Sequence, residues 1–254
     1  ANGEDIDALL ATNGLSDLLV EKTATIGEKL SVRRFAKVTG DVVTSYIHGG
    51  GRIGVIIAAN GAADDAAKEA ITNIAMQVAA MNPQYISRND ISDEELAKLR
   101  EITVDSALND ATTLPKPILN KLIDKAINEK LWSDDDINNF NEHKNNMNYV
   151  WNFLSDAAKA KLGELAMADK ESIVAEKMFN GLVEGRVSKQ LKEICLLDQT
   201  YVKAEDGKQS VAKYLESVSK DLTITEMVRF EVGEGMEKKQ EDFAAEVAAQ
   251  MAGV

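Results

Sequence analysis

Residues 42–60 read VVTSYIHGGGRIGVIIAAN, and the sequence of this stretch predicts two strands joined by a turn. The residues on either side of the glycines are mostly β-branched or apolar, as in strands. Gly49, Gly50 and Gly51 between them permit the positive φ angles of a tight hairpin turn. Side chains alternate along a strand, so each strand presents two faces. On the first strand, one face carries Val43, Ser45 and Ile47, and the other carries Val42, Thr44, Tyr46 and His48.

The segments beside this hairpin predict more of an antiparallel sheet and a helix to cover it. Residues 31–38 are predicted to form a strand that leads through Gly40 and Asp41 into the hairpin, which gives a three-stranded meander. Near the other end of the chain, Thr223 to Val232 alternates as a strand that would complete the sheet. Residues 63–81 predict a helix whose apolar stripe covers the apolar face of the sheet.

The rest of the sequence predicts helices. Residues 4–30 have helical spacing with a break at Gly14, and residues 208–219 and 236–252 are also predicted to be helical. From Ile86 to Val187 strand signals are absent. In that region Ser92 with Glu95 forms a capping-box pattern. We expect five aromatic residues to give this region its own small core, namely Trp132, Phe140, Tyr149, Trp151 and Phe153.

These patterns predict an α+β fold in which an antiparallel sheet is backed by helices, with a large helical, coiled-coil-like insertion and a C-terminal helix. We expect four parts. Residues 1–40 are the end of an N-terminal core subdomain. Residues 41–96 and 186–233 together form a C-terminal core subdomain. Residues 97–185 form the helical insertion, of a dimerisation type, and residues 234–254 form a C-terminal helical module.

Composition narrows the function classes. The 254 residues are 44% hydrophobic and carry a net charge of −13, which argues against direct nucleic-acid binding because phosphate contacts need a basic face. The single cysteine, Cys195, cannot form an internal disulfide and is typical of a reducing cytoplasm, where we expect the protein to act. The sequence contains no run of 18 apolar residues, so we predict no membrane-spanning helix.

The sequence does not predict a nucleotide-binding site. Residues 49–54 formally match G-x-G-x-x-G, but a dinucleotide site needs a helix directly after the glycines, and here a strand is predicted to follow. The sequence also has no G-x-x-x-x-G-K-[ST] phosphate-binding loop.

Candidates for catalysis or metal binding are equally weak. Asp134, Asp135 and Asp136 follow Ser133 and are better explained as a helix start than as a metal site. Cys195 lies among leucines and isoleucines, which predicts a buried thiol rather than a nucleophile. We therefore predict no catalytic residue, no metal site, no cofactor and no enzymatic activity.

Four stretches, which follow one another along the chain, resemble stretches of one known protein family. The run YIHGGGRIGV at residues 46–55 resembles the hairpin of bacterial translation elongation factor Ts. The same family is matched by IGEK at 26–29 with VRR at 32–34, and by IAM at 74–76 with AAMNP at 79–83. The fourth stretch is VRFEVGEG at 228–235, which continues into DFAAEV at 242–247.

The resemblance implies a guanine-nucleotide exchange factor that binds the GTPase elongation factor Tu and promotes release of GDP. It also implies contact residues. His48 would face the third domain of the GTPase, with Arg52 beside it, and Ile26 and Gly27 would touch its nucleotide-binding domain. Asp242 and Phe243 correspond to the family's C-terminal module. From its position alone, His48 is better explained as a polar residue at a turn.

The family's ubiquitin-associated-like N-terminal domain and its Thr-Asp-Phe-Val loop are not matched in this sequence. We therefore expect the chain to be the C-terminal core portion of such a factor. The helical insertion stands where the family carries a projection that supports dimerisation in some members, which implies a possible homodimer. The alternative hypothesis is a docking or oligomerisation fragment without exchange activity of its own.

Overall fold

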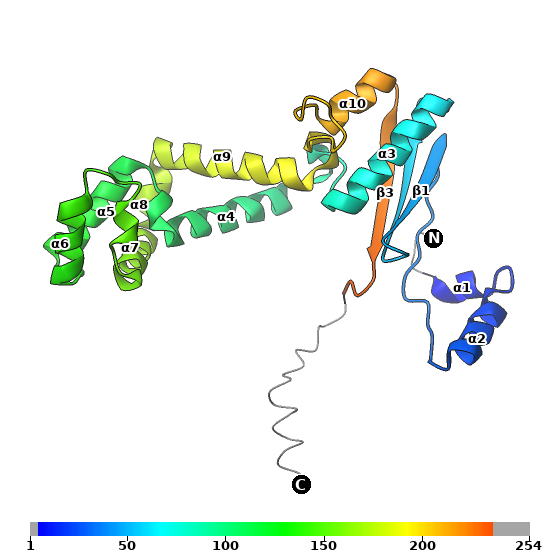
Figure 1. Ribbon diagram of the computed structural model, residues 1–254, viewed down its shortest axis with the longest axis horizontal. Helices are drawn as coiled ribbons and strands as arrows, with labels where there is room; N and C mark the ends of the chain where they lie inside the picture. The colour runs from blue at the N-terminus through cyan, green and yellow to red at the C-terminus, as the bar shows by residue number, and fades with distance from the viewer. Residues whose placement is uncertain (1–4, 236–254) are drawn as a thin grey trace, which may run out of the picture. The chain divides into compact units, whose positions relative to one another are not determined.

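The computed structural model describes residues 5–235 of the chain. Two compact units make up the fold. Residues 1–82 and 213–254 form unit 1, and residues 83–212 form unit 2. Unit 1 holds the sheet and unit 2 is helical, so the predicted α+β class is confirmed (Figure 1).

The sheet of unit 1 has three antiparallel strands in the order β1-β2-β3, namely β1 (Val42–His48), β2 (Ile53–Asn60) and β3 (Thr223–Glu231). The predicted hairpin is confirmed, since Val42 pairs with Ala59 at one end and His48 with Ile53 at the other. The three turn glycines have φ angles of 60°, 66° and 95°. The expected strand near the C-terminus is also confirmed, because β3 pairs along the whole of β2.

The strand predicted at residues 31–38 is wrong, because these residues form no regular structure. Side-chain bonds connect this segment to β3 and to the residues after it. Glu226 accepts the backbone N–H of Thr39 at 3.1 Å, and Arg34 lies 3.1 Å from the carboxylate of Glu234. The predicted meander placed this segment beside β1, but the described sheet ends at β1 and has β3, from the far end of the sequence, as its third strand beside β2.

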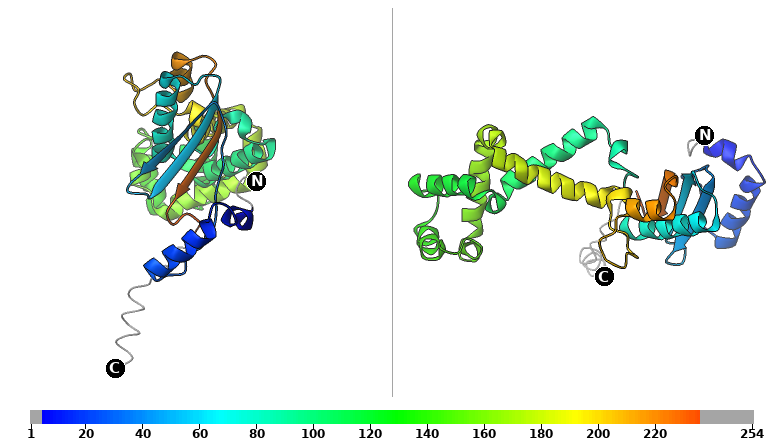
Figure 2. Two further views of the ribbon diagram at one scale, coloured as in Figure 1. Left: turned by 90° about the vertical axis from the view of Figure 1, so that its right-hand side faces the viewer. Right: turned by 90° about the horizontal axis from the view of Figure 1, so that it is seen from above.

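Helix α3 (Asp65–Met81) confirms the predicted cover of the sheet and packs on β1 and β2 (Figure 2). Asp64 caps its start by accepting the Ala67 N–H at 2.8 Å. The covered face is buried and the opposite face is not, since Val42 is 3% exposed and Val43 is 43% exposed. Each large side chain buried in this layer contributes about 1.5–3 kcal/mol. The buried stripe of α3 includes Ala67, Ala70, Ile71, Ile74, Ala75 and Val78.

Three further helices lie near the ends of the described chain, namely α1 (Ile6–Leu10), α2 (Leu15–Ile26) and α10 (Val211–Val218). The break predicted at Gly14 is confirmed, since Gly14 has a φ of 70° between α1 and α2. Neither α1 nor α2 has a buried residue. In unit 1, Asn73 of α3 donates a hydrogen bond to the Tyr214 hydroxyl at 3.1 Å. The terminal helix predicted at residues 236–252 lies outside the described residues.

Unit 2 contains six α-helices and four short 3₁₀ turns within residues 83–212. The helices are α4 (Asp93–Asn109), α5 (Lys116–Asn128), α6 (Asp134–His143), α7 (Asp156–Ala168), α8 (Lys170–Ala175) and α9 (Lys177–Ile194). The 3₁₀ turns are η1 (Arg88–Asp90), η2 (Ala111–Thr113), η3 (Val150–Asn152) and η4 (Leu196–Asp198). Helices α4 and α9 contact each other and run in opposite directions (Figures 1 and 2).

The capping box predicted at Ser92 and Glu95 is confirmed at the start of α4. The aromatic core predicted for this region is only partly correct. Trp132 and Phe140 are buried and meet edge to face with ring centroids 5.8 Å apart, whereas Tyr149 is 62% exposed and Phe153 is 47% exposed. Aliphatic stripes on several helices fill most of the core instead. Among the described helices, none is long and apolar enough to cross a membrane.

Candidate partner-binding site

The β1–β2 turn places two of the predicted contact residues next to each other. His48 ends β1, and its carbonyl accepts the backbone N–H of Arg52 at 3.1 Å. The Arg52 carbonyl in turn accepts the N–H of Val232 at 2.8 Å, which fixes the turn against the end of β3. Both His48 and Arg52 are exposed. The hairpin therefore presents an imidazole and a guanidinium at one tip of unit 1.

Tyr46 lies beside His48 on the same face of β1, because the two residues are separated by one position. The Tyr46 hydroxyl is 3.0 Å from His48 Nδ1, and the ring centroids are 5.9 Å apart with planes tilted by 38°. Tyr46 is half-buried and His48 is exposed. Tyr46 was not among the site residues predicted from the sequence, although its spacing from His48 already placed both on one face.

The strand register extends this surface across the sheet. Tyr46 pairs with Val55, which pairs with Arg229 of β3, and His48 pairs with Ile53, which pairs with Glu231. Arg229 and Glu231 form an ion pair at 2.8 Å. The Arg229 side chain is only 13% exposed, and its Nε is buried without a hydrogen-bond partner among the described residues. We call the surface formed by Tyr46, His48, Arg229 and Glu231 the hairpin face.

Ile26 and Gly27 lie at the end of α2, on a different element from the hairpin. Gly27 has a φ of 79°, and its N–H bonds the Thr23 carbonyl at 2.9 Å to cap the helix. Glycine suits this position because the left-handed conformation carries no penalty for it. The Ile26 side chain is 57% exposed. This helix end presents an exposed apolar side chain on a fixed backbone, which suits a protein contact.

An apolar hollow of about 290 Å³ lies along α1 and α2 in unit 1. Leucines and one lysine line most of it, and its lining contains no histidine, cysteine or carboxylate. Its lining residues are Leu9, Leu10, Leu15, Leu18, Leu19, Lys22, Leu30 and Val32.

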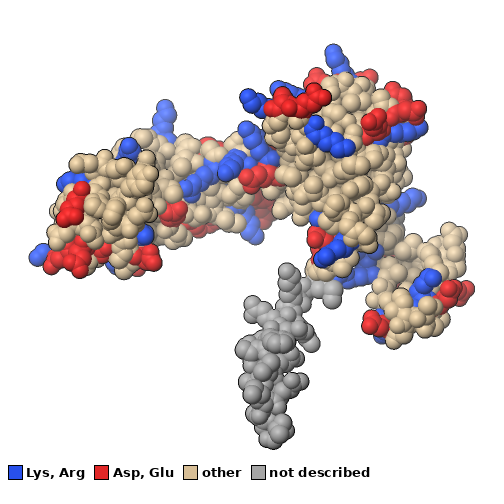
Figure 3. All heavy atoms as spheres, viewed as in Figure 1, with Lys and Arg blue, Asp and Glu red and all other residues tan. Residues whose placement is uncertain are grey.

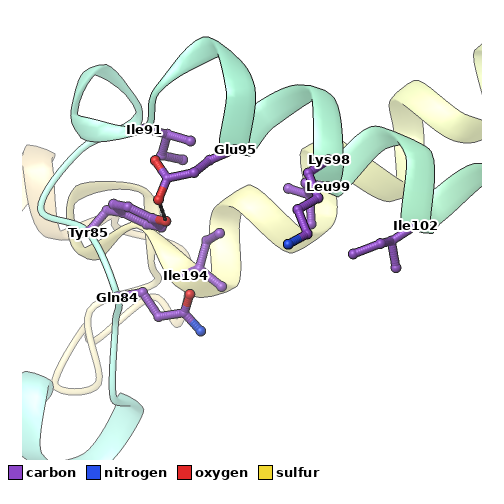
Figure 4. Close-up of a pocket in the computed structure, with 8 residues that line it drawn as sticks. All are labelled: Gln84, Tyr85, Ile91, Glu95, Lys98, Leu99, Ile102 and Ile194. Carbon is purple, nitrogen blue, oxygen red and sulfur yellow. Dashed lines mark hydrogen bonds between the residues drawn. The ribbon is translucent and has the colours of Figure 1, made fainter.

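Unit 2 has a smaller hollow of about 200 Å³, which Figure 4 shows between α4, the end of α9 and the segment before α4. The Tyr85 hydroxyl donates to Glu95 Oε1 at 3.1 Å (Figure 4). Hydrogen bonds from Ser92 and then from Tyr85 lower the pKa of Glu95, and the bond to Glu95 raises the pKa of Tyr85. Glu95 is thus an ionised helix cap rather than a general acid or base.

The other candidates from the sequence have structural roles. The acidic run confirms the predicted helix start, since Ser133 caps α6 by accepting the Asp136 N–H at 3.1 Å. Acidic side chains gather over α6 and α7 (Figure 3), but residues 5–235 contain no cluster of three potential metal ligands. Cys195 is buried as predicted, and burial raises the pKa of its thiol. His143 packs edge-on against Phe153 with ring centroids 3.6 Å apart.

The predicted contact residues Asp242 and Phe243 lie outside the described residues. The structure thus brings His48 and Arg52 together and adds Tyr46, Arg229 and Glu231 to their surroundings. It places Ile26 and Gly27 on a separate exposed element. These groups offer hydrogen-bonding, charged and apolar contacts of the kind that dock a protein.

Known proteins match this chain over nearly its whole length. The family model described as elongation factor TS matches residues 2–133 and 126–234. Elongation factor Ts of Clostridioides difficile strain 630 is 36% identical over 257 residues, which cover 98% of this chain and 64% of that protein. The protein of the same name from Clostridium perfringens strain ATCC 13124 is 37% identical over 241 residues, which cover 92% of this chain and 58% of that protein.

The C. perfringens strain 13 protein gives the same identity of 37% over 241 residues. The chain therefore spans about three fifths of the length of these relatives, from coverages of 64% and 58%. The two segments matched by the family model include the hairpin and β3. On this evidence, the chain belongs to the elongation factor Ts family.

Proposed function

We propose that this chain takes part in guanine-nucleotide exchange on elongation factor Tu in the cytoplasm, by binding the GDP-loaded GTPase and promoting release of GDP. The observation that carries the proposal is the tip of the hairpin, where the exposed His48 stands on a fixed turn at the position that the family resemblance assigns to the GTPase contact. Family membership supports the same reading.

The mechanism requires differential binding rather than a catalytic side chain. A factor that binds the nucleotide-free GTPase more tightly than the loaded form must weaken nucleotide binding by the same factor, since coupling between two ligands is reciprocal. Each tenfold weakening requires about 1.4 kcal/mol of difference in contact energy. A few contacts that are made only with the nucleotide-free GTPase are enough.

Two elements of unit 1 are suited to supply such contacts. His48 and Arg52 stand on the hairpin, which the register of the sheet holds in place, and Ile26 stands at the capped end of α2. Under the proposal, the hairpin contacts the third domain of the GTPase and the α2 end contacts its nucleotide-binding domain. Asp242 and Phe243 would add a further contact from the C-terminal module.

Release of a fluorescent GDP analogue from purified elongation factor Tu tests the proposal. We expect the chain to accelerate release, and His48→Ala to reduce the acceleration roughly tenfold, as for loss of an interface contact of 1–2 kcal/mol. His143→Ala is the matched control, because His143 is the only other histidine and lies in unit 2. Binding without acceleration would indicate a docking fragment. Absence of both binding and release would overturn the proposal.

A further inference from the structure

We propose that Tyr46 is a positioning residue that holds the His48 imidazole in the tautomer with its proton on Nε2. His48 would then present a hydrogen-bond donor to its partner, and the partner's contacting group would be an acceptor such as a backbone carbonyl or a carboxylate. The identity of the partner rests on the proposed function. The tautomer of His48 does not.

The geometry assigns one ring nitrogen to the protein itself. Tyr46 Oη lies 3.0 Å from His48 Nδ1, which is hydrogen-bond distance. Both side chains stand on the same face of β1, and the strand register fixes their backbone positions. Because Nδ1 is engaged by Tyr46, Nε2 on the other side of the ring is the nitrogen left for a partner.

The proton of the neutral ring has two possible places. If the phenol O–H donates to Nδ1, the ring proton must be on Nε2, and if Nδ1 carries the proton, the phenol oxygen must accept it. A phenol O–H is a better donor than its oxygen is an acceptor, since the lone pair is shared with the ring. The first arrangement is therefore favoured, in keeping with the rule that the bond made by one ring nitrogen sets the state of the other.

The difference in burial between the two residues explains why Tyr46 can act on His48. Tyr46 is half-buried, with Val55 of β2 opposite it, so its ring has fewer accessible positions than that of the exposed His48. A phenol held by its surroundings orients the exposed imidazole and lowers the entropy lost when His48 meets a partner. Removal of the hydroxyl should then weaken binding even though Tyr46 itself need not touch the partner.

Nitrogen NMR of the imidazoles tests the tautomer in the chain alone. The sequence has two histidines, so a His143→Gln variant assigns the His48 signals. At a pH where the ring is neutral, we expect a protonated Nε2 and an unprotonated, hydrogen-bonded Nδ1. In Tyr46→Phe the Nδ1 signal should move toward that of a free acceptor nitrogen. A protonated Nδ1 in the wild type, or spectra unchanged by Tyr46→Phe, would overturn the inference.

Calorimetric binding to elongation factor Tu tests the donor role. We expect Tyr46→Phe to raise Kd roughly threefold to tenfold, the size of one hydrogen bond. His48→Gln should bind more tightly than His48→Asn, because the glutamine amide nitrogen reaches the place of Nε2 and the asparagine nitrogen that of Nδ1. Tyr149→Phe, an exposed tyrosine of unit 2, is the control that should leave Kd unchanged.

The two measurements separate this inference from the proposed function. Equal binding by the glutamine and asparagine variants, or the reverse order, would overturn the donor role. If the wild-type chain does not bind elongation factor Tu at all, the proposed function fails together with the partner contact, and the NMR result alone decides the role of Tyr46.

Discussion

The carboxylate of Asp136 accepts the backbone N–H of Ser155 at 2.8 Å and the Ser155 hydroxyl at 2.9 Å. It also accepts the Ser133 hydroxyl at 2.6 Å. Asp136 stands in the first turn of α6, and Ser155 is the N-cap of α7, so one buried carboxylate joins the starts of two helices. The aspartate run that the sequence predicts to start a helix thus also supplies, through Asp136, a connection between two helices of unit 2.

We expect Asp136→Ala to lower the free energy of unfolding of unit 2 by about 1–3 kcal/mol, since it leaves buried hydrogen-bonding groups without partners. Urea unfolding followed by tryptophan fluorescence measures this, because Trp132 and Trp151 both lie in unit 2. Asp135→Ala is the matched control, since Asp135 is exposed in the same turn. Equal effects of both substitutions would contradict the structural role.

Because of the same carboxylate, we expect the stability of unit 2 to fall at acidic pH. Burial raises the pKa of Asp136, but hydrogen bonds from Ser133 and Ser155 outweigh it and lower the pKa below the ordinary 3.8. A lowered pKa means that the contribution to stability is complete above the unfolded-state value and is lost as pH falls through the folded-state value. Urea midpoints measured between about pH 5 and pH 2 should fall more steeply in the wild type than in Asp136→Asn. Parallel curves would contradict this assignment.

Gly61 is required where the end of β2 approaches Asp221 just before β3. Its φ is +96°, and a Cβ at this position would overlap the Asp221 backbone carbonyl. We expect Gly61→Ala to destabilise the sheet by more than about 2 kcal/mol, because strain and overlap add. Gly50→Ala, at a φ of +66° with open space around it, should cost only about 1–2 kcal/mol. Hydrogen exchange of the β2 amides measures both, and an equal loss of protection would argue against the overlap.

Arg34 should control the ionisation of Glu234. Its guanidinium lies 3.1 Å from the Glu234 carboxylate and 4.5 Å from the Phe230 ring centroid. A hydrogen bond from Arg34 lowers the pKa of Glu234, helped by the Glu231 N–H. We expect Arg34→Ala to raise that pKa toward the ordinary value of 4.5, as followed by carboxyl NMR. The pair is exposed, so overall stability should change by less than about 1 kcal/mol. A Glu234 titration unaltered by Arg34→Ala would show that the ion pair does not form in solution.

Features that depend on neighbouring residues could be predicted from the sequence. Alternation and three glycines gave the β1–β2 hairpin, and a stripe of residues from Ala67 to Val78 gave α3 and its buried side. Caps at Ser92 and Ser133 marked the starts of α4 and α6. Each of these depends on backbone conformation or on side chains within one or two turns, which local physical chemistry fixes.

Tertiary structure alone decided which distant groups meet. Residues 31–38 have the alternation of a strand, yet they stay outside the sheet, and β3, almost 200 residues later, supplies the third strand beside β2. Tyr149 and Phe153 have the chemistry of core residues, yet aliphatic stripes fill the core and leave them exposed. Pairing and packing depend on contacts between segments far apart in the chain, and the pattern of one segment does not specify its partner.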